Sequence, residues 1–368
     1  MKVCILSMQQ IDNMGSLLQS YALKKTIETL GSEVEFIDIK KRDEDYILLG
    51  GHRQEYHEEH EKDGLMGKIG KIDRYTLNRL KIKRKSGEQR TAFDEFRVKY
   101  LNTDRKNCQY DLCVIGSDEV FNCLNSGAWG FTSQLFGNVP EANKVITYAA
   151  SCGSTKYEEL PEKVAEKIRK TFENITAFSV RDENTHKFVG KLTDKLIYDN
   201  LDPVLIYNFD REIEQSSLPK MPAHYCVIYS YYNRIHTSDE IDAIKEFCKK
   251  NQLTPVAIGA PQFWIKDYIV CSPFQCLRIF KESEFVITDT FHGTIFASKY
   301  ANKFAVLSRD SNKNKLLDLV EKIGIKKHLM SSILELEDKY SFLKSKDNFD
   351  LIIEEETRKT THYLKSNM

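Results

Sequence analysis

Residues 2–39 read KVCILSMQQIDNMGSLLQSYALKKTIETLGSEVEFIDI. The apolar run Lys2–Ser7 predicts a buried strand, and residues 12–15 predict a turn after it. A helix is expected from about Ser16 to Leu30, where Gly31 stops it, and Glu33–Ile39 predicts a second strand. Two unbroken apolar strands joined by a helix predict a parallel sheet that is covered on both faces.

The same alternation returns twice along the chain. After a heavily charged excursion over residues 40–106, a first series of strands is predicted, and a second series follows a polar stretch with Pro219 and Pro222. A chain of 368 residues also exceeds one ordinary core. We therefore expect an α/β protein with two Rossmann-like, doubly wound domains and a cleft between them. The expected division is 1–211, a linker 212–223, 224–348, and a C-terminal helix 349–368.

Composition excludes several classes of protein. Lysine and arginine number 54 and aspartate and glutamate 54, so net charge gives no argument for nucleic-acid binding. The nine cysteines contain no Cys-x-x-Cys pair, and several lie in apolar runs, as free thiols do in a reducing compartment. The apolar run at the N-terminus is too short for a signal peptide, and no stretch reaches transmembrane length. A cytoplasmic location is expected.

One segment predicts an anion-binding strand end. Residues 285–298 read FVITDTFHGTIFAS, a buried strand that ends at Thr288 before His292-Gly293-Thr294 open a helix. Backbone N–H groups and the dipole at a helix start favour an anion, and Gly293 would let a ligand come close. His292 adds a proton carrier. The alternative is that Thr290 only caps the helix and His292 is a packed residue.

Two arginines also follow strands. Arg181 and Arg309 could each make a forked contact with a carboxylate or a phosphate. The alternative for each is a salt bridge to its neighbour in sequence, Asp182 or Asp310.

The N-terminal half offers short polar groups at strand ends. Asp118 is the acidic one and is a candidate general base, although it could instead cap a turn. The others suit hydrogen bonds to hydroxyls of an acceptor: Asn13, Gly15, Gln19, Ser117 and Ser151. We expect no metal, because the histidines at 52, 57 and 60 stand among glutamates in what is more simply a solvated charged loop.

Six short motifs follow one another along the chain. They are Asp12-Asn-Met-Gly-Ser-Leu-Leu-Gln-Ser-Tyr-Ala-Leu23, Val114-Ile-Gly-Ser-Asp-Glu-Val-Phe-Asn122, Tyr148-Ala-Ala-Ser-Cys-Gly153, Ser179-Val-Arg-Asp-Glu183, Leu201-Asp-Pro203 and Thr288-Asp-Thr-Phe-His-Gly293. In sequence and in order they resemble the motifs of the polysaccharide pyruvyl transferase family. The resemblance covers about residues 1–39 and 110–325, with Glu119, Phe121 and Cys152 as departures from the family pattern.

The resemblance implies a glycosyltransferase-B-like fold and an enzyme of exopolysaccharide or cell-wall synthesis. Phosphoenolpyruvate would be the donor substrate, with no cofactor, and a saccharide would receive pyruvate as a ketal. Arg181, His292, Gly293, Thr294 and Arg309 are then candidates for binding the donor. His292 and Asp118 are candidates for acid–base catalysis.

Two other functions stay open on the same architecture: a glycosyltransferase that uses a nucleotide sugar, and a non-catalytic sugar-binding protein. The acceptor sugar and the oligomeric state are not predicted. A lipid-linked acceptor would suit peripheral contact with an anionic membrane through the basic segment 67–85, whose alternative is an ordinary helix that packs on its own domain.

Overall fold

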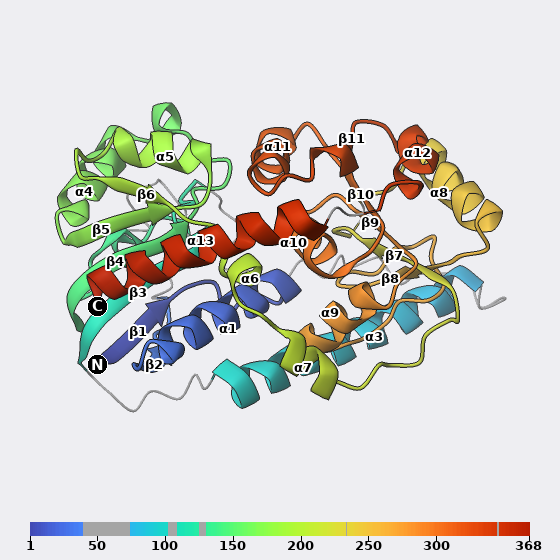
Figure 1. The fold of residues 1–368 in the computed structure, drawn as a ribbon, viewed down its shortest axis with the longest axis horizontal. Coiled ribbons are helices and arrows are strands. Elements are labelled where there is room, and N and C mark those ends of the chain that lie inside the picture. Colours follow the sequence, from blue (N-terminus) through green and yellow to red (C-terminus); the bar gives the residue numbers. More distant parts are fainter. Residues whose placement is uncertain (40–73, 102–108, 125–129, 233, 344–345) are drawn as a thin grey trace, which may run out of the picture.

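The computed structural model describes residues 1–39, 74–101, 109–124, 130–232, 234–343 and 346–368. Two α/β lobes lie side by side, each built around a parallel sheet (Figure 1). The histidines at 52, 57 and 60 and residues 67–73 of the basic segment lie outside the described residues.

The N-terminal sheet has the strand order β2-β1-β3-β4-β5-β6, and every neighbouring pair is parallel. Strands β1, β3 and β5 are almost wholly buried, because helices cover both faces, whereas the edge strand β6 is partly exposed. The strands are β1 (Lys2–Leu6), β2 (Glu33–Phe36), β3 (Tyr110–Asp118), β4 (Ala142–Ala150), β5 (Ile175–Val180) and β6 (Ile197–Asp199). The helices are α1 (Met14–Thr29), α4 (Glu162–Phe172), α5 (Glu183–Gly190) and α6 (Pro203–Ile206).

The C-terminal sheet has the order β11-β10-β9-β7-β8 and is also parallel. The strands are β7 (Tyr225–Tyr229), β8 (Thr254–Ala257), β9 (Phe285–Thr288), β10 (Phe304–Leu307) and β11 (Leu329–Met330). The helices are α7 (Asp210–Gln215), α8 (Ser238–Lys250), α9 (Pro273–Lys281), α10 (Phe291–Tyr300), α11 (Lys313–Lys322) and α12 (Leu336–Tyr340).

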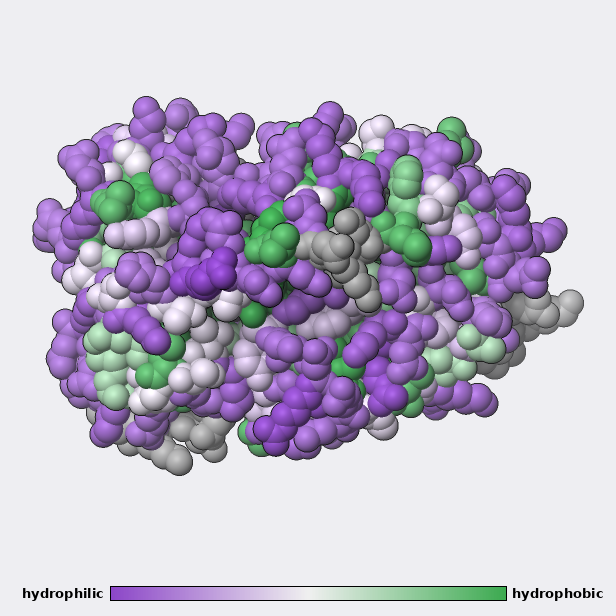
Figure 2. All heavy atoms as spheres, in the orientation of Figure 1, coloured by the Kyte–Doolittle hydropathy of each residue, from purple (hydrophilic) through white to green (hydrophobic). Residues whose placement is uncertain are grey.

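Two long helices tie the lobes together. Helix α13 (Lys346–Asn367) runs from the C-terminal lobe back across the N-terminal one (Figure 1), where the Tyr363 hydroxyl donates to the Thr147 carbonyl at 2.7 Å. Helix α3 (Arg74–Phe96) reaches the C-terminal lobe, because the Gln89 amide donates to the Cys271 carbonyl at 2.8 Å. Figure 2 shows that the face crossed by α13 is mainly hydrophilic, with scattered apolar spots.

Helix α1 explains why the two lobes share one core. It packs on β2 and β3 and also on α6, α9 and α10, so residues all round it are buried, including Leu17, Leu18 and Leu23. A helix that is apolar on every side is expected at such a junction. One hydrophobic cluster therefore continues through both lobes, and the far face of each sheet has a cluster of its own.

The predicted fold class is confirmed: there are two doubly wound parallel sheets. The predicted linker 212–223 begins inside helix α7, and the short strand β11 was not predicted. A strand of two residues leaves almost no pattern to detect. None of the helices in the described ranges is long and apolar enough to cross a bilayer.

Candidate active site

Both sheets change winding direction at the same place in their strand order. In the N-terminal sheet the switch lies between β1 and β3, and in the C-terminal sheet it lies between β7 and β9. Loops diverge at such a point and leave a crevice at the carboxyl ends of the strands. Asp118 ends β3, while β9 leads through Asp289 and Thr290 into helix α10.

A buried arginine holds two carboxylates at the N-terminal switch point. The Arg181 guanidinium lies 3.2 Å from Asp118 Oδ1 and 2.8 Å from Asp202 Oδ2, and its side chain is 1% exposed. Ser16, in the first turn of α1, donates to Asp118 Oδ2 at 2.9 Å. Asp118 has a φ of 76°, a strained backbone conformation for an aspartate that is typical of functional sites.

The imidazole of His292 meets this cluster from the other lobe. Thr290 caps helix α10 by accepting from the Gly293 N–H at 3.0 Å, which fixes the helix start that carries His292. His292 Nε2 then lies 3.4 Å from Asp202 Oδ2. A Cβ on Gly15 would lie 2.2 Å from His292 Cγ, so the imidazole rests directly on the backbone of Gly15. The site therefore exists only where the two lobes meet.

The charges of this cluster determine its protonation states. Burial alone would raise the pKa of Asp118, but the charges of Arg181, His292 and Lys315 outweigh burial and lower it. Burial opposes the ionised form of Asp202 too, yet His292 and Arg181 lower its pKa to about 2. Both carboxylates are therefore ionised at neutral pH.

Asp289, at the C-terminal switch point, behaves in the opposite way. Burial raises its pKa, although Arg234 and Arg309 partly oppose the shift.

Asp118 and His292 open onto a cavity of about 230 Å³, whose wall also includes Asn13, Ser16, Phe291 and Lys315, while Asp202 is buried behind them. A larger hollow of about 950 Å³ shares part of that wall and adds basic residues such as Arg234 and Lys313. Since both hollows are lined from the two lobes, they form one cleft with ionised carboxylates in its floor and cations along its side.

The Phe291 ring organises the cationic side of the cleft. The Arg181 guanidinium lies 4.3 Å from the ring centre, and the Lys315 ammonium lies 4.8 Å from it. Lys315 also forms a 2.6 Å ion pair with Glu119 of the other lobe, which lowers the pKa of Glu119. This pair bridges the cleft at its mouth.

Of the residues predicted to bind the acceptor, two lie at the cleft and three are buried within the N-terminal lobe. Asn13 lines the cleft and caps α1, and Gly15 lies beneath His292. Gln19, Ser117 and Ser151 are fully buried and bonded within their own lobe: Gln19 donates to Ser7, Ser117 to the Ala149 carbonyl and Ser151 to Asp182. Direct contact of these three with a ligand remains a prediction that their burial disfavours.

Of the residues predicted to bind the donor, only His292 lies on the wall of the cleft. Arg309 binds Asp289 and Glu240, and Arg181 binds Asp118 and Asp202, so neither arginine takes the neighbour in sequence considered for it. Thr294 is buried and donates to the Thr290 carbonyl.

Gly293 is explained by packing rather than by approach of a ligand. A Cβ there would lie 2.1 Å from Thr288 Oγ1 and 2.7 Å from the Tyr229 ring, so the residue must be small to fit its own lobe. Its N–H is also already taken by the Thr290 cap.

Several residues of the cleft were not predicted for it. Asp202, which is buried behind the cleft, stands three residues after the end of strand β6 in the Leu201-Asp-Pro203 motif, so its position near a strand end was a usable signal. No sequence signal marked the other residues, which are Ser16, Tyr231, Phe291 and Lys315. They occupy ordinary loop and helix positions and come to line the cleft only because the two lobes lie against each other.

Comparison with known families decides the relationship. The sequence profile described as polysaccharide pyruvyl transferase matches residues 13–311. This chain belongs to the polysaccharide pyruvyl transferase family. The matched range contains Asn13, Asp118, Arg181, Asp202 and His292, so the whole polar cluster of the cleft lies within the part shared with the family. No curated protein matches the chain.

Solved structures place the pyruvyl transferase fold among two-lobed enzymes. The UDP-GlcNAc 2-epimerase of Methanocaldococcus jannaschii, in complex with UDP-GlcNAc and UDP, is 11% identical with a TM-score of 0.50, over 98% of this chain and 100% of that one. A putative UDP-N-acetylglucosamine 2-epimerase from Listeria monocytogenes is 11% identical, with a TM-score of 0.49 over 99% and 95%. Spinosyn rhamnosyltransferase is 10% identical, with a TM-score of 0.40 over 100% and 99%. The fold is glycosyltransferase-B-like, as predicted.

In the described part of the chain, no three metal-ligating side chains stand close enough together to hold a metal ion. The eight cysteines described are all buried free thiols.

Proposed function

We propose that this chain transfers the pyruvyl group of phosphoenolpyruvate to two hydroxyls of a saccharide, forming a ketal and releasing phosphate. The observation that carries the proposal is the meeting of His292 with the Arg181–Asp118–Asp202 cluster across the lobes, in a chain of the pyruvyl transferase family. The site pairs a proton carrier with ionised carboxylates, as this reaction requires.

The donor brings two anionic groups that need cations. Lys315, Arg234 and Lys313 line the cleft and are suited to hold its phosphate and carboxylate. Arg181 and Arg309 each already bind two carboxylates, so we assign them to holding those carboxylates in place. The helix start at Gly293 and Thr294 contributes its dipole more than free N–H groups.

His292 is proposed to protonate the methylene carbon of the enol. Its Nε2 lies 3.4 Å from the ionised carboxylate of Asp202, which holds the imidazole in position for the proton transfer. Protonation makes the adjacent carbon electrophilic, and an acceptor hydroxyl adds there. The carbon–oxygen bond to phosphate then breaks, and the second hydroxyl closes the ketal. One hydroxyl proton returns to His292 and the other leaves with the phosphate, so the step balances.

Asp118 is proposed to accept a hydrogen bond from the attacking hydroxyl. Its lowered pKa makes it a weak base, so its contribution is mainly to orient the hydroxyl and to stabilise the developing positive charge. Removal of a positioned acid or base typically costs about 10²–10⁴-fold in rate.

The biological setting follows from the same proposal. We infer a cytoplasmic enzyme of exopolysaccharide or cell-wall synthesis whose acceptor could be lipid-linked. The eight buried thiols fit a reducing compartment.

The test uses phosphoenolpyruvate with p-nitrophenyl glycosides of galactose, glucose, mannose and N-acetylmannosamine. Transfer should release phosphate and add to one glycoside the mass of a pyruvate less one water. We expect His292→Ala and Asp118→Asn to lose at least about 10²-fold in rate. Near-normal turnover in both variants would refute the assignment, and transfer from a nucleotide sugar instead would favour a glycosyltransferase.

A further inference from the structure

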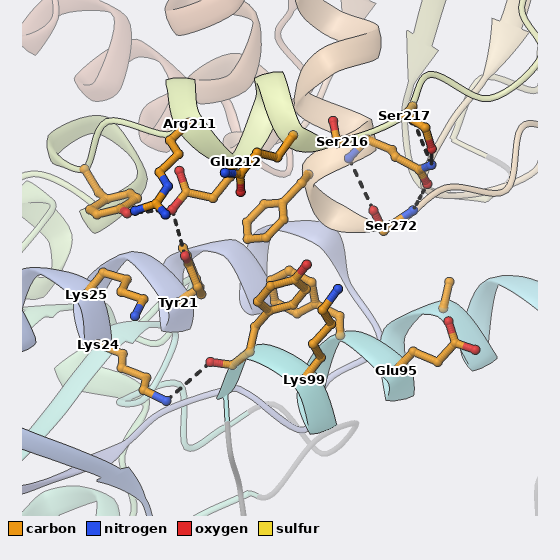
Figure 3. A pocket seen from close by; sticks show the side chains of 17 residues that line it. Tyr21, Lys24, Lys25, Glu95, Lys99, Arg211, Glu212, Ser216, Ser217 and Ser272 are labelled. Atoms are coloured by element: carbon orange, nitrogen blue, oxygen red, sulfur yellow. Dashed lines mark hydrogen bonds between the residues drawn. The ribbon is translucent and has the colours of Figure 1, made fainter.

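A second cavity, of about 760 Å³, lies away from the cleft at the joint between the lobes; we call it the rear pocket (Figure 3). Its walls come from α1 and α3, from the π-helix η1 (Arg97–Leu101), and from α7 and α9. Its volume lies within the usual range for small-molecule sites. None of its lining residues lines the catalytic cleft.

The floor of the rear pocket is aromatic. The Phe274 ring centre lies 5.0 Å from that of Tyr21, 5.0 Å from that of Phe96 and 4.9 Å from that of Tyr100. These edge-on contacts hold the rings rigid. Tyr21, Phe96 and Phe274 are themselves buried, so the half-buried rings of Tyr100 and Tyr207 are the aromatic surface that the C–H groups of a sugar ring can contact.

A carboxylate with one free oxygen stands beside this floor. Glu212 Oε1 accepts from the Tyr21 and Tyr207 hydroxyls, each at 2.7 Å. Burial, together with Glu212, raises the pKa of both tyrosines, so they stay protonated as donors. Glu212 Oε2 is buried and accepts no hydrogen bond from any described residue. A buried acceptor without a partner is costly, and a ligand hydroxyl would satisfy it.

Two cations of the wall are available to an anion. Lys99 and Arg211 are exposed and form no ion pair within the described ranges, and Figure 3 shows them approaching the aromatic rings from different sides. Lys24, by contrast, donates to the Tyr100 and Leu101 carbonyls, and Lys25 is paired with Glu28. Among the described residues, Lys99 and Arg211 are therefore the lysine and arginine of this wall without an ion pair, and the Lys99 ammonium lies 4.9 Å from the centre of the Tyr100 ring.

We propose that the rear pocket binds a phosphorylated monosaccharide. The sugar ring rests on the aromatic floor, a ring hydroxyl donates to Glu212 Oε2, and Lys99 and Arg211 hold the phosphate. Helix α1 joins this pocket to the cleft, because Tyr21 lines the first and Ser16 the second. The inference does not depend on the proposed reaction.

The test is calorimetric titration of the full chain with α-D-glucose 1-phosphate. We expect saturable binding, with glucose and inorganic phosphate each at least about tenfold weaker, because each supplies only part of the recognised chemistry. Uridine monophosphate binding as tightly as the sugar phosphate would overturn the assignment to a sugar. Absence of saturable binding up to about 10 mM would overturn the site itself.

Variants of the lining residues test whether glucose 1-phosphate binds in the rear pocket. Lys99→Ala with Arg211→Ala should weaken glucose 1-phosphate at least about tenfold, while the matched exposed pair Lys163→Ala with Lys245→Ala should not. All four side chains are exposed, so unchanged thermal unfolding is expected for both double variants. His292→Ala, in the cleft, should bind like wild type. Binding that survives the first pair, or that is lost in His292→Ala, would place the ligand elsewhere and contradict the proposal.

Discussion

The two switch points of this protein share a strand order but carry opposite chemistry. The N-terminal one presents Asp118 and Asp202, whose pKa values are lowered by the charges around them. The C-terminal one presents His292 and Lys315 to the cleft, while its own carboxylate, Asp289, has a raised pKa. Neither half forms the polar cluster alone, since the cluster arises where the buried carboxylates of one lobe meet His292 at the start of helix α10 in the other. Equivalent topology therefore fixes where a site lies but not what it does.

Removal of the cation from the N-terminal cluster should cause the largest loss of stability. Replacement of Arg181 by alanine leaves Asp118 and Asp202 buried without their cation, which should cost about 3–5 kcal/mol of unfolding free energy. Denaturant unfolding measures this cost. The matched control is Lys187→Ala, whose pair with Glu183 is largely exposed and should cost no more than about 0.5 kcal/mol. Equal losses in the two variants would contradict the buried-cluster account.

The contact between the halves is tested at Gly15. A Cβ in Gly15→Ala would overlap the His292 ring, so the imidazole must move away from Asp202. We expect about 1–3 kcal/mol of destabilisation and a loss of turnover close to that of His292→Ala. Gly87→Ala is the control, because a Cβ on this exposed helical glycine meets no atom within 4 Å and should slightly stabilise the chain. Full activity in Gly15→Ala would show that His292 does not act from this position.

The pH dependence of stability should differ in sign between the halves. The pKa of Asp202 falls from 3.8 to about 2 on folding, so its ionised form stabilises the protein above pH 4 by about 2 kcal/mol. That contribution is lost as pH falls from about 4 to 2, and the stability gap between wild type and Asp202→Asn should shrink there. Asp289 has a raised pKa, so its protonated form stabilises the folded protein. The stability of wild type relative to Asp289→Asn should therefore rise as pH falls. Denaturant unfolding at several pH values measures both gaps.

The smallest effect is expected at the mouth of the cleft. Glu119→Gln removes the charge of the Glu119–Lys315 pair, whose side chains are 36% and 22% exposed, so stability should change by less than about 1 kcal/mol. The released Lys315 should bind phosphoenolpyruvate slightly more tightly, by about two- to fivefold. Titration at low and high salt checks this, and a large loss of stability would show that the pair holds the lobes together.

In both halves, the sequence predicted local features better than contacts between residues that are distant along the chain. Two doubly wound domains, Asp118 and His292 follow from strand ends and helix starts, because those features are local. The partners of Arg181 and Arg309 do not, since Asp202 and Asp289 reach them only through the order of the strands. In the sequence, Gly15 is an ordinary residue at the start of a helix. In the structure no side chain fits at this position, because the ring of His292 from the other lobe lies against its backbone.

The rear pocket was hidden for the same reason. Tyr21, Phe96 and Phe274 each read as ordinary apolar positions of helices, and the free oxygen of Glu212 is apparent only from its contacts. Sites at a joint between lobes depend on tertiary arrangement, which local patterns do not encode.

The central claim is that the donor binds where His292 meets the carboxylate cluster. Calorimetric titration of phosphoenolpyruvate into wild type and His292→Ala tests it directly, without an acceptor, so that no transfer consumes the donor during the titration. The account predicts saturable binding to wild type that is weakened at least about tenfold in the variant. Equal binding to both proteins, or binding of a uridine diphosphate sugar with no response to phosphoenolpyruvate, would contradict it.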